Sequence, residues 1–374
     1  MKIGIICYKY PLYEQGSHLQ EFVDSLAARS EKIVLISGRF PSSAFISPGN
    51  ITFHWIPLIP VPLIGDFIFQ VSVFIAGIRF LRGSIDLINV FSARPALPAF
   101  LLGKILKKPV VCTIEIINQD SVSFNDMIFN KIQRIVYSLK FNKIICWSRY
   151  YFDTYLSKWG IRKQNVEIIP AGINLKRFSP GISGNSIRNR YSPSSTVLVF
   201  AKPMYDYNRK MAELLLSAVK SLEKEITIYV LLGDGEERSL LESRIKELRM
   251  EDRVSFMPKV PITDIPMYLS ASDFVVLPFT YKPTTSRSLL ESLAMGKAVV
   301  TTRCGEIPAM LENGKDAIIV NSDINEIAGA IRKLAFDKSL RVSLGSHARM
   351  LAEREFSIDR ITEKNIKLFR ELIE

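Results

Sequence analysis

Short apolar segments alternate with helical patterns along the first half of the chain, and this alternation restricts its fold more than any other feature. The segments are rich in Val and Ile and lie at 2–7, 32–37, 86–91, 109–115, 143–147 and 166–169. Helical patterns fill the intervals at 18–29, 67–82, 96–107, 126–140 and 149–158. Nearly continuous Val and Ile content is typical of parallel strands covered on both faces. Strand–helix alternation therefore predicts an open, doubly wound sheet.

The alternation restarts after an interruption at 179–195, which is rich in Ser, Pro, Gly and Asn and reads as a linker. Further strands are predicted at 196–200, 225–232, 253–256, 273–278 and 297–302, and the sequence from about 323 onward is helical. A chain of 374 residues has room for two domains. We predict an α/β protein with doubly wound domains at 1–180 and 196–355, a linker at 181–195, and a final helix at 356–374 that packs back on the first domain. Ligands of such sheets bind beyond the carboxyl ends of the strands, so the expected site is the cleft between two facing domains.

Charge and missing motifs exclude several classes of function. Residues 1–180 carry 21 Lys and Arg against 11 Asp and Glu, whereas the remainder carries 28 against 26, so nearly all of the net charge of +12 lies in the first half. The four cysteines, Cys7, Cys112, Cys146 and Cys304, have no metal-ligand spacing, and this usage suits a reducing compartment. There is no GxGxxG, GxxxxGK[ST], HExxH or GxSxG sequence. Dinucleotide, P-loop, metal-dependent and serine-hydrolase chemistry therefore lack their usual sequence support.

Residues 55–81 are mostly apolar, but Pro57, Pro60 and Pro62 interrupt them. The uninterrupted part, 67–80, is shorter than the roughly 20 residues of a membrane-spanning helix. A buried helix is the favoured interpretation, and an apolar surface that dips into one face of a bilayer is the alternative. The N-terminal sequence MKIGIICYKYP has too short an apolar run for an export signal. We expect a cytoplasmic protein, peripheral on the cytoplasmic face of the membrane if the alternative holds.

Cations follow the first strand of the second domain. Lys202 comes directly after the strand at 196–200, and Arg209 and Lys210 lie at the start of the next helix. Cations at a strand end and a helix N-terminus can cradle a phosphate. The plainer alternative is a solvated basic face.

Two further strand ends in the second domain, and one in the first, carry candidate ligand-binding residues. Gly233 and Gly235 form a tight turn that lets a backbone approach a ligand closely, although an ordinary strand-to-helix turn would need the same residues. A capped helix begins at 286, with free N–H groups for an anion and a carboxylate for the two hydroxyls of a ribose, and its candidates are Thr285, Ser286, Arg287 and Glu291. In the first domain, Gly16 precedes a helix that begins near His18 and can admit a phosphate or sugar, or Ser17 is a simple helix cap.

These residues in this order resemble the family 4 glycosyltransferases, retaining enzymes with two Rossmann-like domains that face each other across a cleft, the GT-B fold. VEIIPAGINLKRFSP (166–180) is similar to the motif that ends the family's first domain. VLLGDGEERSLLE (230–242) and DRVSFMPKVPITDIPMYLSASDFVVLPF (252–279) resemble its donor-domain core. The match is completed by SRSLLESLAMGKAVVTT (286–302), GEIPAMLENGKDAIIV (305–320) and LGSHARMLAEREFS (344–357).

The resemblance implies a nucleotide-sugar in the second domain and an acceptor in the first. Lys202 stands where the family has an Arg and Lys210 where it has its Lys, so both would stabilise the leaving diphosphate electrostatically. Glu291 matches the second Glu of the E-x7-E motif, the ribose partner, and Gly16 matches the Gly-rich loop. The family depends on no bound metal, and no cofactor besides the sugar donor is expected.

The chain departs from the family pattern at several positions. The first Glu of E-x7-E, which contacts the donor sugar in the family, is replaced by Pro283. The family's T-x-H sequence reads Thr113-Ile114-Glu115, so either Glu115 substitutes for the His as a polar contact or that role is lost. The acceptor-side candidates are therefore His18 and Glu115. Ala171 replaces an Asn, Glu306 replaces the second Gly of G-G-x-P-E, and Ala309 replaces its Glu. The identity of the sugar therefore stays open.

Residues 101–180 hold 13 Lys and Arg against 5 Asp and Glu, which suits an anionic membrane that presents a lipid-linked glycan acceptor. A basic surface without membrane contact is the alternative. Two rival functions stay open, and the first is a non-catalytic nucleotide- or sugar-binding protein on the same fold. The second is a nucleic-acid binder, which is not expected because its cations are hardly interleaved with aromatic residues.

Overall fold

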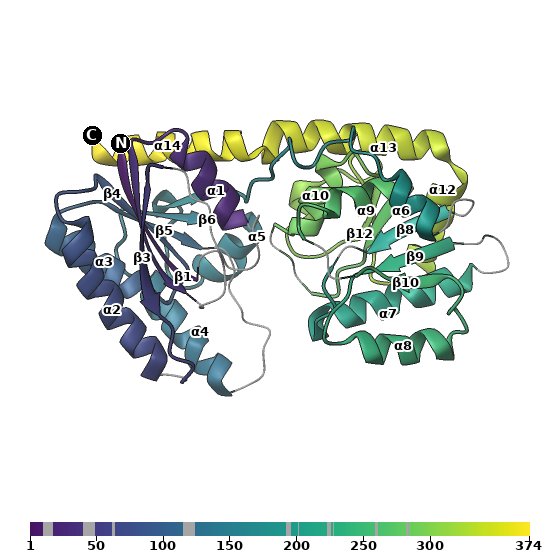
Figure 1. Ribbon diagram of the computed structural model, residues 1–374, viewed down its shortest axis with the longest axis horizontal. Helices are drawn as coiled ribbons and strands as arrows, with labels where there is room; N and C mark the ends of the chain where they lie inside the picture. Colours follow the sequence, from purple (N-terminus) through teal and green to yellow (C-terminus); the bar gives the residue numbers. More distant parts are fainter. Residues whose placement is uncertain are drawn as a thin grey trace. The chain divides into compact units, whose positions relative to one another are not determined.

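The computed structural model describes residues 1–9, 18–39, 49–61, 64–114, 124–191, 196–200, 202–222, 226, 228–258, 261–281, 283 and 285–374. They form two compact units. The first unit comprises Met1–Ala171 and Ile358–Glu374, and the second comprises Gly172–Ser357. Each unit is built on one parallel sheet (Figure 1).

The sheet of the first unit has the strand order β3-β2-β1-β4-β5-β6-β7. Its strands are β1 (Lys2–Lys9), β2 (Lys32–Arg39), β3 (Ile51–Pro57), β4 (Leu87–Phe91), β5 (Val110–Ile114), β6 (Lys143–Cys146) and β7 (Val166–Ile168). All pairs are parallel, and β4 and β5 are buried throughout, as their apolar sequences predict. Strand β3 was not predicted, because it lies at the edge of the sheet, where a half-exposed ITFHWIP lacks the continuous apolar signature.

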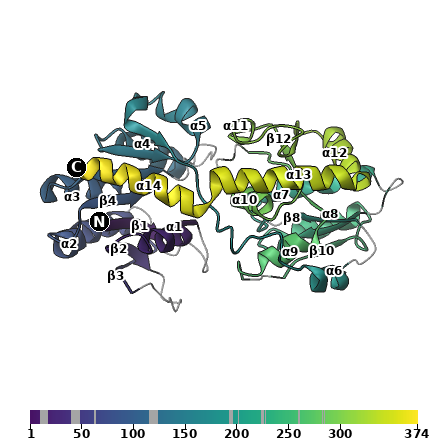
Figure 2. The ribbon, with the colours of Figure 1, turned by 90° about the horizontal axis from the view of Figure 1, so that it is seen from above.

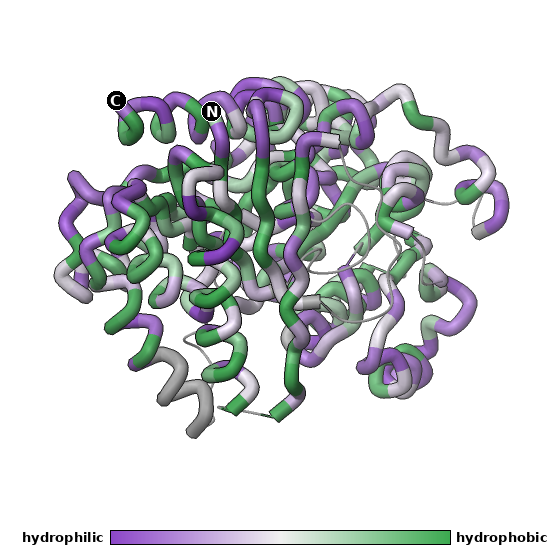
Figure 3. Tube along the Cα trace, turned by 60° about the vertical axis from the view of Figure 1, so that its left-hand side comes forward, coloured by the Kyte–Doolittle hydropathy of each residue, from purple (hydrophilic) through white to green (hydrophobic). Residues whose placement is uncertain are grey.

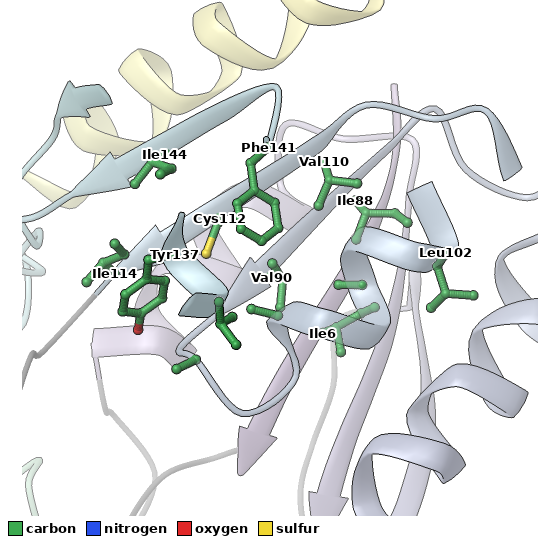
Figure 4. Packing of buried hydrophobic residues seen from close by; sticks show 14 of the residues in the cluster. Ile6, Ile88, Val90, Leu102, Val110, Cys112, Ile114, Tyr137, Phe141 and Ile144 are labelled. Carbon is green, nitrogen blue, oxygen red and sulfur yellow. The ribbon is translucent and has the colours of Figure 1, made fainter. Parts of the chain in front are cut away.

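Helices cover both faces of this sheet (Figures 1 and 2). One face packs against α2 (Ile64–Leu81), α3 (Ala96–Leu106) and α4 (Phe124–Tyr137), and Figure 4 shows part of that core, including Ile6, Val90 and Tyr137. The other face packs against α1 (His18–Ala27) and α14 (Ile358–Ile373). A short α5 (Arg149–Tyr151) continues into a π-helical turn at Phe152–Leu156. Cys112 is fully buried in this core, beside Tyr137, which is 1% exposed.

Helix α2 corrects the prediction of a buried helix at 67–80. It is the one helix of the described residues that is long and apolar enough to cross a membrane, yet only 28% of its 18-residue window is buried. Phe67 is 68% exposed and Ile75 is 61% exposed. The sequence pattern failed here because apolar residues surround the helix, so periodicity gives no indication of which side faces solvent.

The sheet of the second unit has the strand order β10-β9-β8-β11-β12-β13, again all parallel. Its strands are β8 (Thr196–Phe200), β9 (Ile228–Leu232), β10 (Val254–Phe256), β11 (Phe274–Leu277), β12 (Val299–Thr302) and β13 (Ile318–Val320). The helices are α6 (Asn185–Tyr191), α7 (Asp206–Ser221), α8 (Arg238–Glu247), α9 (Ile265–Ala271), α10 (Arg287–Ala294), α11 (Ile307–Met310), α12 (Ile324–Phe336) and α13 (Lys338–Leu351). Only β13 was not among the predicted strands.

The predicted linker at 181–195 is wrong as a linker, since most of it is folded into the second unit. It contains α6, and the Arg188 guanidinium lies 2.7 Å from the Asp273 carboxylate. A Cβ on Gly184 would lie 2.2 Å from the backbone nitrogen of Ala271, so α6 packs closely on α9. The composition misled because Ser, Gly and Asn also serve as helix caps. The chain enters the second unit at 171–172 and leaves it at 357–358, where α14 joins the first unit.

Two helical glycines form a matched pair for a stability test. A Cβ on Gly345 of α13 would lie 2.1 Å from the carbonyl oxygen of Gly296, whereas a Cβ on Gly329 of α12 would meet nothing within 4 Å. We expect Gly345→Ala to lower the free energy of unfolding by about 1–3 kcal/mol through overpacking. Gly329→Ala should raise it by about 0.4–1 kcal/mol, since Ala restricts the unfolded chain. Chemical denaturation of both variants tests this, and equal effects would contradict the close helix packing.

Candidate functional site

The order of the strands fixes where a ligand site can form in the second unit. β8 lies between β9 and β11, so the connections that follow β8 and β11 leave the sheet toward opposite sides. Open α/β sheets bind ligands at this kind of switch point, beyond the carboxyl ends of the strands. Lys202 follows β8, and the segment from Pro278 to Ser286 follows β11. The predicted residues of both segments are therefore brought to one edge of the sheet.

Lys202 is a buried cation at this edge. It is 8% exposed, and its Nζ lies 3.3 Å from the Tyr281 hydroxyl and 5.1 Å from the centre of the Phe279 ring. Burial lowers the pKa of Lys202 to about 8, and the nearby Glu291 carboxylate opposes this shift. A cation held in an apolar and aromatic setting interacts strongly with any anion that reaches it.

Glu291 provides the carboxylate of the site. It lies on α10, is 4% exposed, and accepts a hydrogen bond of 2.7 Å from Nε of Arg287 one turn earlier. Its effect on the pKa of Lys202 shows that the side chains that follow β8 and those of α10 share one electrostatic environment. The structure thus brings together three of the predicted residues, Lys202, Arg287 and Glu291.

The start of α10 presents hydrogen-bonding groups. Ser286 is the N-cap, but its side chain forms no capping hydrogen bond. The Oγ of Ser286 is buried and has no hydrogen-bond partner among the described residues. Thr285 is 6% exposed beside it. A buried hydroxyl next to free helix N–H groups can hold an anion.

The structure explains why glycine is needed at 233 and 235, and the sequence did not indicate this reason. A Cβ on Gly233 would lie 2.0 Å from the Lys202 carbonyl oxygen, and one on Gly235 would lie 2.7 Å from the Met204 backbone. The Met204 N–H also donates to the Asp234 carbonyl at 3.1 Å. These glycines therefore let the turn after β9 support the backbone that carries Lys202. Contact between them and a ligand stays a prediction.

Arg209 and Lys210, predicted as a pair, differ in their surroundings. The Arg209 guanidinium lies 2.7 Å from the Glu213 carboxylate and 2.9 Å from that of Glu237. The hydrogen bond that the Arg209 guanidinium donates to Glu213 is the largest cause that raises the pKa of Arg209. Lys210 is exposed and makes no ion pair with any residue that the structure describes. Of the two cations, Lys210 is therefore the one whose charge no described residue compensates.

Three residues near the site were not among the predicted ligands. Phe279 and Tyr281 surround Lys202, and Glu306 is 6% exposed. The Glu306 N–H donates to the Pro283 carbonyl at 3.0 Å, and the Cys304 thiol lies 3.3 Å from the Tyr281 carbonyl oxygen. The sequence could have indicated these residues by their position in the loops after β11 and β12, because loops at strand ends often carry binding residues.

Only one of the candidate site residues predicted in the first unit, His18, is described. Gly16 and Glu115 lie outside the described residues. His18 is the first residue of α1, and its ring lies 5.8 Å from the Trp147 ring in an edge-to-face arrangement. Within the part of the chain that the structure describes, no group of three His, Cys, Asp or Glu side chains could hold a metal ion.

Two family descriptions match the sequence. Residues 15–177 match "Glycosyltransferase Family 4", and residues 195–337 match "Glycosyl transferases group 1". D-inositol 3-phosphate glycosyltransferase of Corynebacterium jeikeium is 28% identical over 221 residues, which cover 55% of this chain and 52% of that protein. The lipopolysaccharide core biosynthesis glycosyltransferase LpsD of Rhizobium meliloti is 29% identical over 208 residues, or 55% and 58% of the two chains. The chain thus spans little more than half the length of these relatives.

Solved structures resemble the whole chain. Sucrose-phosphate synthase of Thermosynechococcus elongatus covers 99% of this chain and 98% of its own, with a TM-score of 0.84 and 18% identity. HepE of Anabaena in complex with UDP-glucose covers 100% of both chains, with a TM-score of 0.79 and 17% identity. At these identities the likeness shows the fold alone.

Proposed function

Because the chain belongs to glycosyltransferase family 4 and has the GT-B fold, we propose that it transfers a sugar from a nucleotide-diphosphate-sugar to an acceptor hydroxyl. The observation that carries the proposal is the buried Lys202 at the switch point of the second unit, within the electrostatic reach of Glu291. A buried ammonium is stable only if a counter-charge offsets its desolvation. The donor diphosphate supplies that counter-charge when it binds.

Stabilisation of the leaving group is the main chemical task of this site. The nucleoside diphosphate gains negative charge as the bond to the sugar breaks. Lys202, Lys210 and the start of α10 at Ser286 face that charge. A preorganised donor in a site shielded from water, as Lys202 is, contributes about 3–4 kcal/mol to catalysis, and the exposed Lys210 contributes less. Lys202 needs no large rearrangement, because Tyr281 and Phe279 already hold its side chain.

Glu291 binds the ribose hydroxyls of the donor in this proposal. Arg287 orients the carboxylate from the same helix through its 2.7 Å hydrogen bond. We further propose that the transfer retains the anomeric configuration, since the sequence resembles retaining enzymes.

Glu306 is our candidate for the sugar contact that Pro283 cannot make. Pro283 stands where the resembling family has a carboxylate that contacts the donor sugar. The Glu306 N–H bonds to the carbonyl of Pro283, and the Glu306 residue is buried. Glu306 thus brings a carboxyl group to the residue that is hydrogen-bonded to Pro283. Carboxylates can accept hydrogen bonds from two sugar hydroxyls at once.

The acceptor is proposed to be a glycoconjugate, and specifically a lipid-linked glycan at an anionic membrane surface. The names of the relatives motivate the proposal of a glycoconjugate acceptor, since LpsD is a lipopolysaccharide core biosynthesis glycosyltransferase. The excess of cations in residues 101–180 motivates the proposal of an anionic membrane surface. A protein that binds the nucleotide-sugar without turnover is the second candidate function, and the loss of family carboxylates at Pro283 and Ala309 favours it.

Thermal denaturation with UDP, GDP and ADP tests the donor site. A nucleotide at about 100 times its dissociation constant stabilises the unit that binds it by about 2.7 kcal/mol. We expect one base to raise the melting temperature by several degrees. Sugars linked to that base are then tested for transfer, and NMR of the anomeric proton reports retention. A shift without turnover on any of them would favour the binding protein, and no shift would contradict both functions.

A further inference from the structure

Helix α2 has one buried side and one exposed side that is also apolar. The buried side follows a spacing of four residues and consists of Gly65, Phe69, Val73, Gly77 and Leu81. The exposed side shows Ile64 at 60%, Phe67 at 68% and Ile75 at 61% exposure. Figure 3 shows hydrophobic colouring over much of this helix. A helix of a globular domain normally turns polar residues to solvent, so this side calls for a binding role.

Helix α3 extends the exposed apolar side. Leu97, Leu101 and Ile105 are 39%, 44% and 55% exposed and are spaced by four residues. The two helices pack closely, since a Cβ on Gly77 would lie 2.2 Å from Cδ1 of Leu102. We call the exposed side chains of both helices the α2–α3 face, which consists of Ile64, Phe67, Ile68, Val71, Ile75, Leu97, Leu101 and Ile105.

The charges beside this face are almost all positive. Asp66 and Asp86 are the two carboxylates between 64 and 108. Asp66 lies 3.4 Å from the Arg94 guanidinium, and Asp86 accepts the backbone N–H of Lys2 at 2.7 Å. Five cations make no ion pair with the described residues, and they are Arg79, Arg82, Lys104, Lys107 and Lys108. They lie in and just beyond the last turns of α2 and α3.

A slot opens between these two helix ends. Its volume is about 260 Å³, and its walls include Ile78 and Leu81 from α2, Ile105 and Leu106 from α3, and the cations Arg82 and Lys108. Cations near a helix C-terminus also offset the helix dipole. The dipole does not account for the exposed apolar side chains next to them. Apolar walls with two cations match an amphiphile that has an anionic head.

We propose that the α2–α3 face seats the first unit on an anionic bilayer, with Arg82 and Lys108 binding the phosphate of a phospholipid headgroup in the slot. This inference rests on the proposed function in so far as a lipid-linked acceptor requires such a surface. Phe69, Val73 and Leu81 remain in the core of the unit, so α2 lies along the membrane and does not cross it. Apolar penetration together with cations is the combination that holds a protein at a membrane interface.

Vesicle flotation of the full chain tests the proposal. We expect binding to phosphatidylcholine vesicles that contain about 30% phosphatidylglycerol and little binding to pure phosphatidylcholine. Arg82→Gln with Lys108→Gln should weaken the partition coefficient about 30-fold, from two cations near the surface. Phe67→Ser with Ile75→Ser should weaken it about 100-fold, because two apolar side chains no longer enter the interface.

Each double variant has a matched control. Arg162 and Lys163 are exposed cations of the first unit, and both changed to Gln should leave partitioning within about twofold. Phe336 and Val342 of the second unit are 65% and 64% exposed. The double variant with Ser at both positions should also leave partitioning within about twofold. Unchanged partitioning of either α2–α3 variant would overturn the proposal. The proposal would also be overturned if the wild type does not bind vesicles but self-associates, and if this self-association is lost in the double variant Phe67→Ser with Ile75→Ser.

The nucleotide-dependent thermal shift is measured on the same variants. A shift that persists when vesicle binding is lost supports a membrane role separate from the donor site. Vesicle binding without any nucleotide shift in the wild type would contradict the proposed function and leave the membrane surface standing.

Discussion

Replacement of Lys202 by Met is expected to lower kcat/KM for the nucleotide-sugar about 100- to 1,000-fold. Met fits the space of the Lys stem beside Phe279 and Tyr281, but it carries no charge and cannot stabilise the leaving diphosphate. Steady-state kinetics on the sugar donor found with the nucleotide panel gives the measurement. Lys210→Met is the control, and we expect a smaller loss, since an exposed cation interacts through water. Equal losses in the two variants would contradict a special role for the buried cation.

The same variant changes the response to pH. The pKa of Lys202 is lowered from 10.5 to about 8, so the folded protein binds this proton less tightly than the unfolded chain does. The contribution of Lys202 to stability therefore rises as the pH increases from about 8 to 10.5, and below pH 8 the charge costs about 3 kcal/mol. We expect Lys202→Met to be more stable than the wild type at pH 7. Wild-type kcat/KM should fall above pH 8 as the ammonium is lost, and this alkaline decline should be missing in the variant.

Glu291→Ala is expected to abolish the nucleotide-dependent thermal shift and to destabilise the second unit by about 3 kcal/mol. Removal of this carboxylate, which is 4% exposed, leaves Arg287 and Lys202 without it as a counter-charge. Because Glu291 raises the pKa of Lys202, its loss should also move the alkaline decline in activity to lower pH. Denaturant titration and the thermal shift with nucleotide measure the two effects.

Leu289→Ala separates lost binding from lost stability. Leu289 is fully buried on the same helix, and its truncation should cost about 2–5 kcal/mol through the cavity it leaves. Leu289 takes no part in the site, so we expect this variant to keep its nucleotide shift. If Leu289→Ala loses the shift as well, destabilisation of α10 would explain the result for Glu291, and the ribose contact would be contradicted.

The sequence predicts the two sheets well because buried parallel strands have a distinct apolar signature. The strands it missed, β3 and β13, are edge strands with partial burial. The linker was wrong for a different reason: helix caps and linkers share Ser, Gly and Asn, and only the packing of α6 on α9 separates the two. Local composition carries no information on such tertiary contacts.

The candidate site could be predicted in part. Lys202 and Glu291 were identified from their places after strands and from the family motif, and the structure puts them within electrostatic reach of each other. The ion pair of Arg209 with Glu213 is local, since the two residues are one turn apart on α7, but the pair with Glu237 could not be predicted, because it depends on the turn after β9 folding back onto α7. The proximity of Glu306 to Pro283 likewise depends on how the connections after β11 and β12 lie side by side.

The division of the first unit into two stretches of sequence has a consequence for its synthesis. Ile361, Leu368 and Phe369 of α14 pack into the same core as Ile3 and Ile5 of β1. A ribosome delivers β1 first and α14 only after the entire second unit has been made. One side of the first sheet is thus covered by α1 but not by α14 throughout that interval, and the second unit can fold before the first is finished. The order in which the two units mature is then the reverse of the order in which they begin.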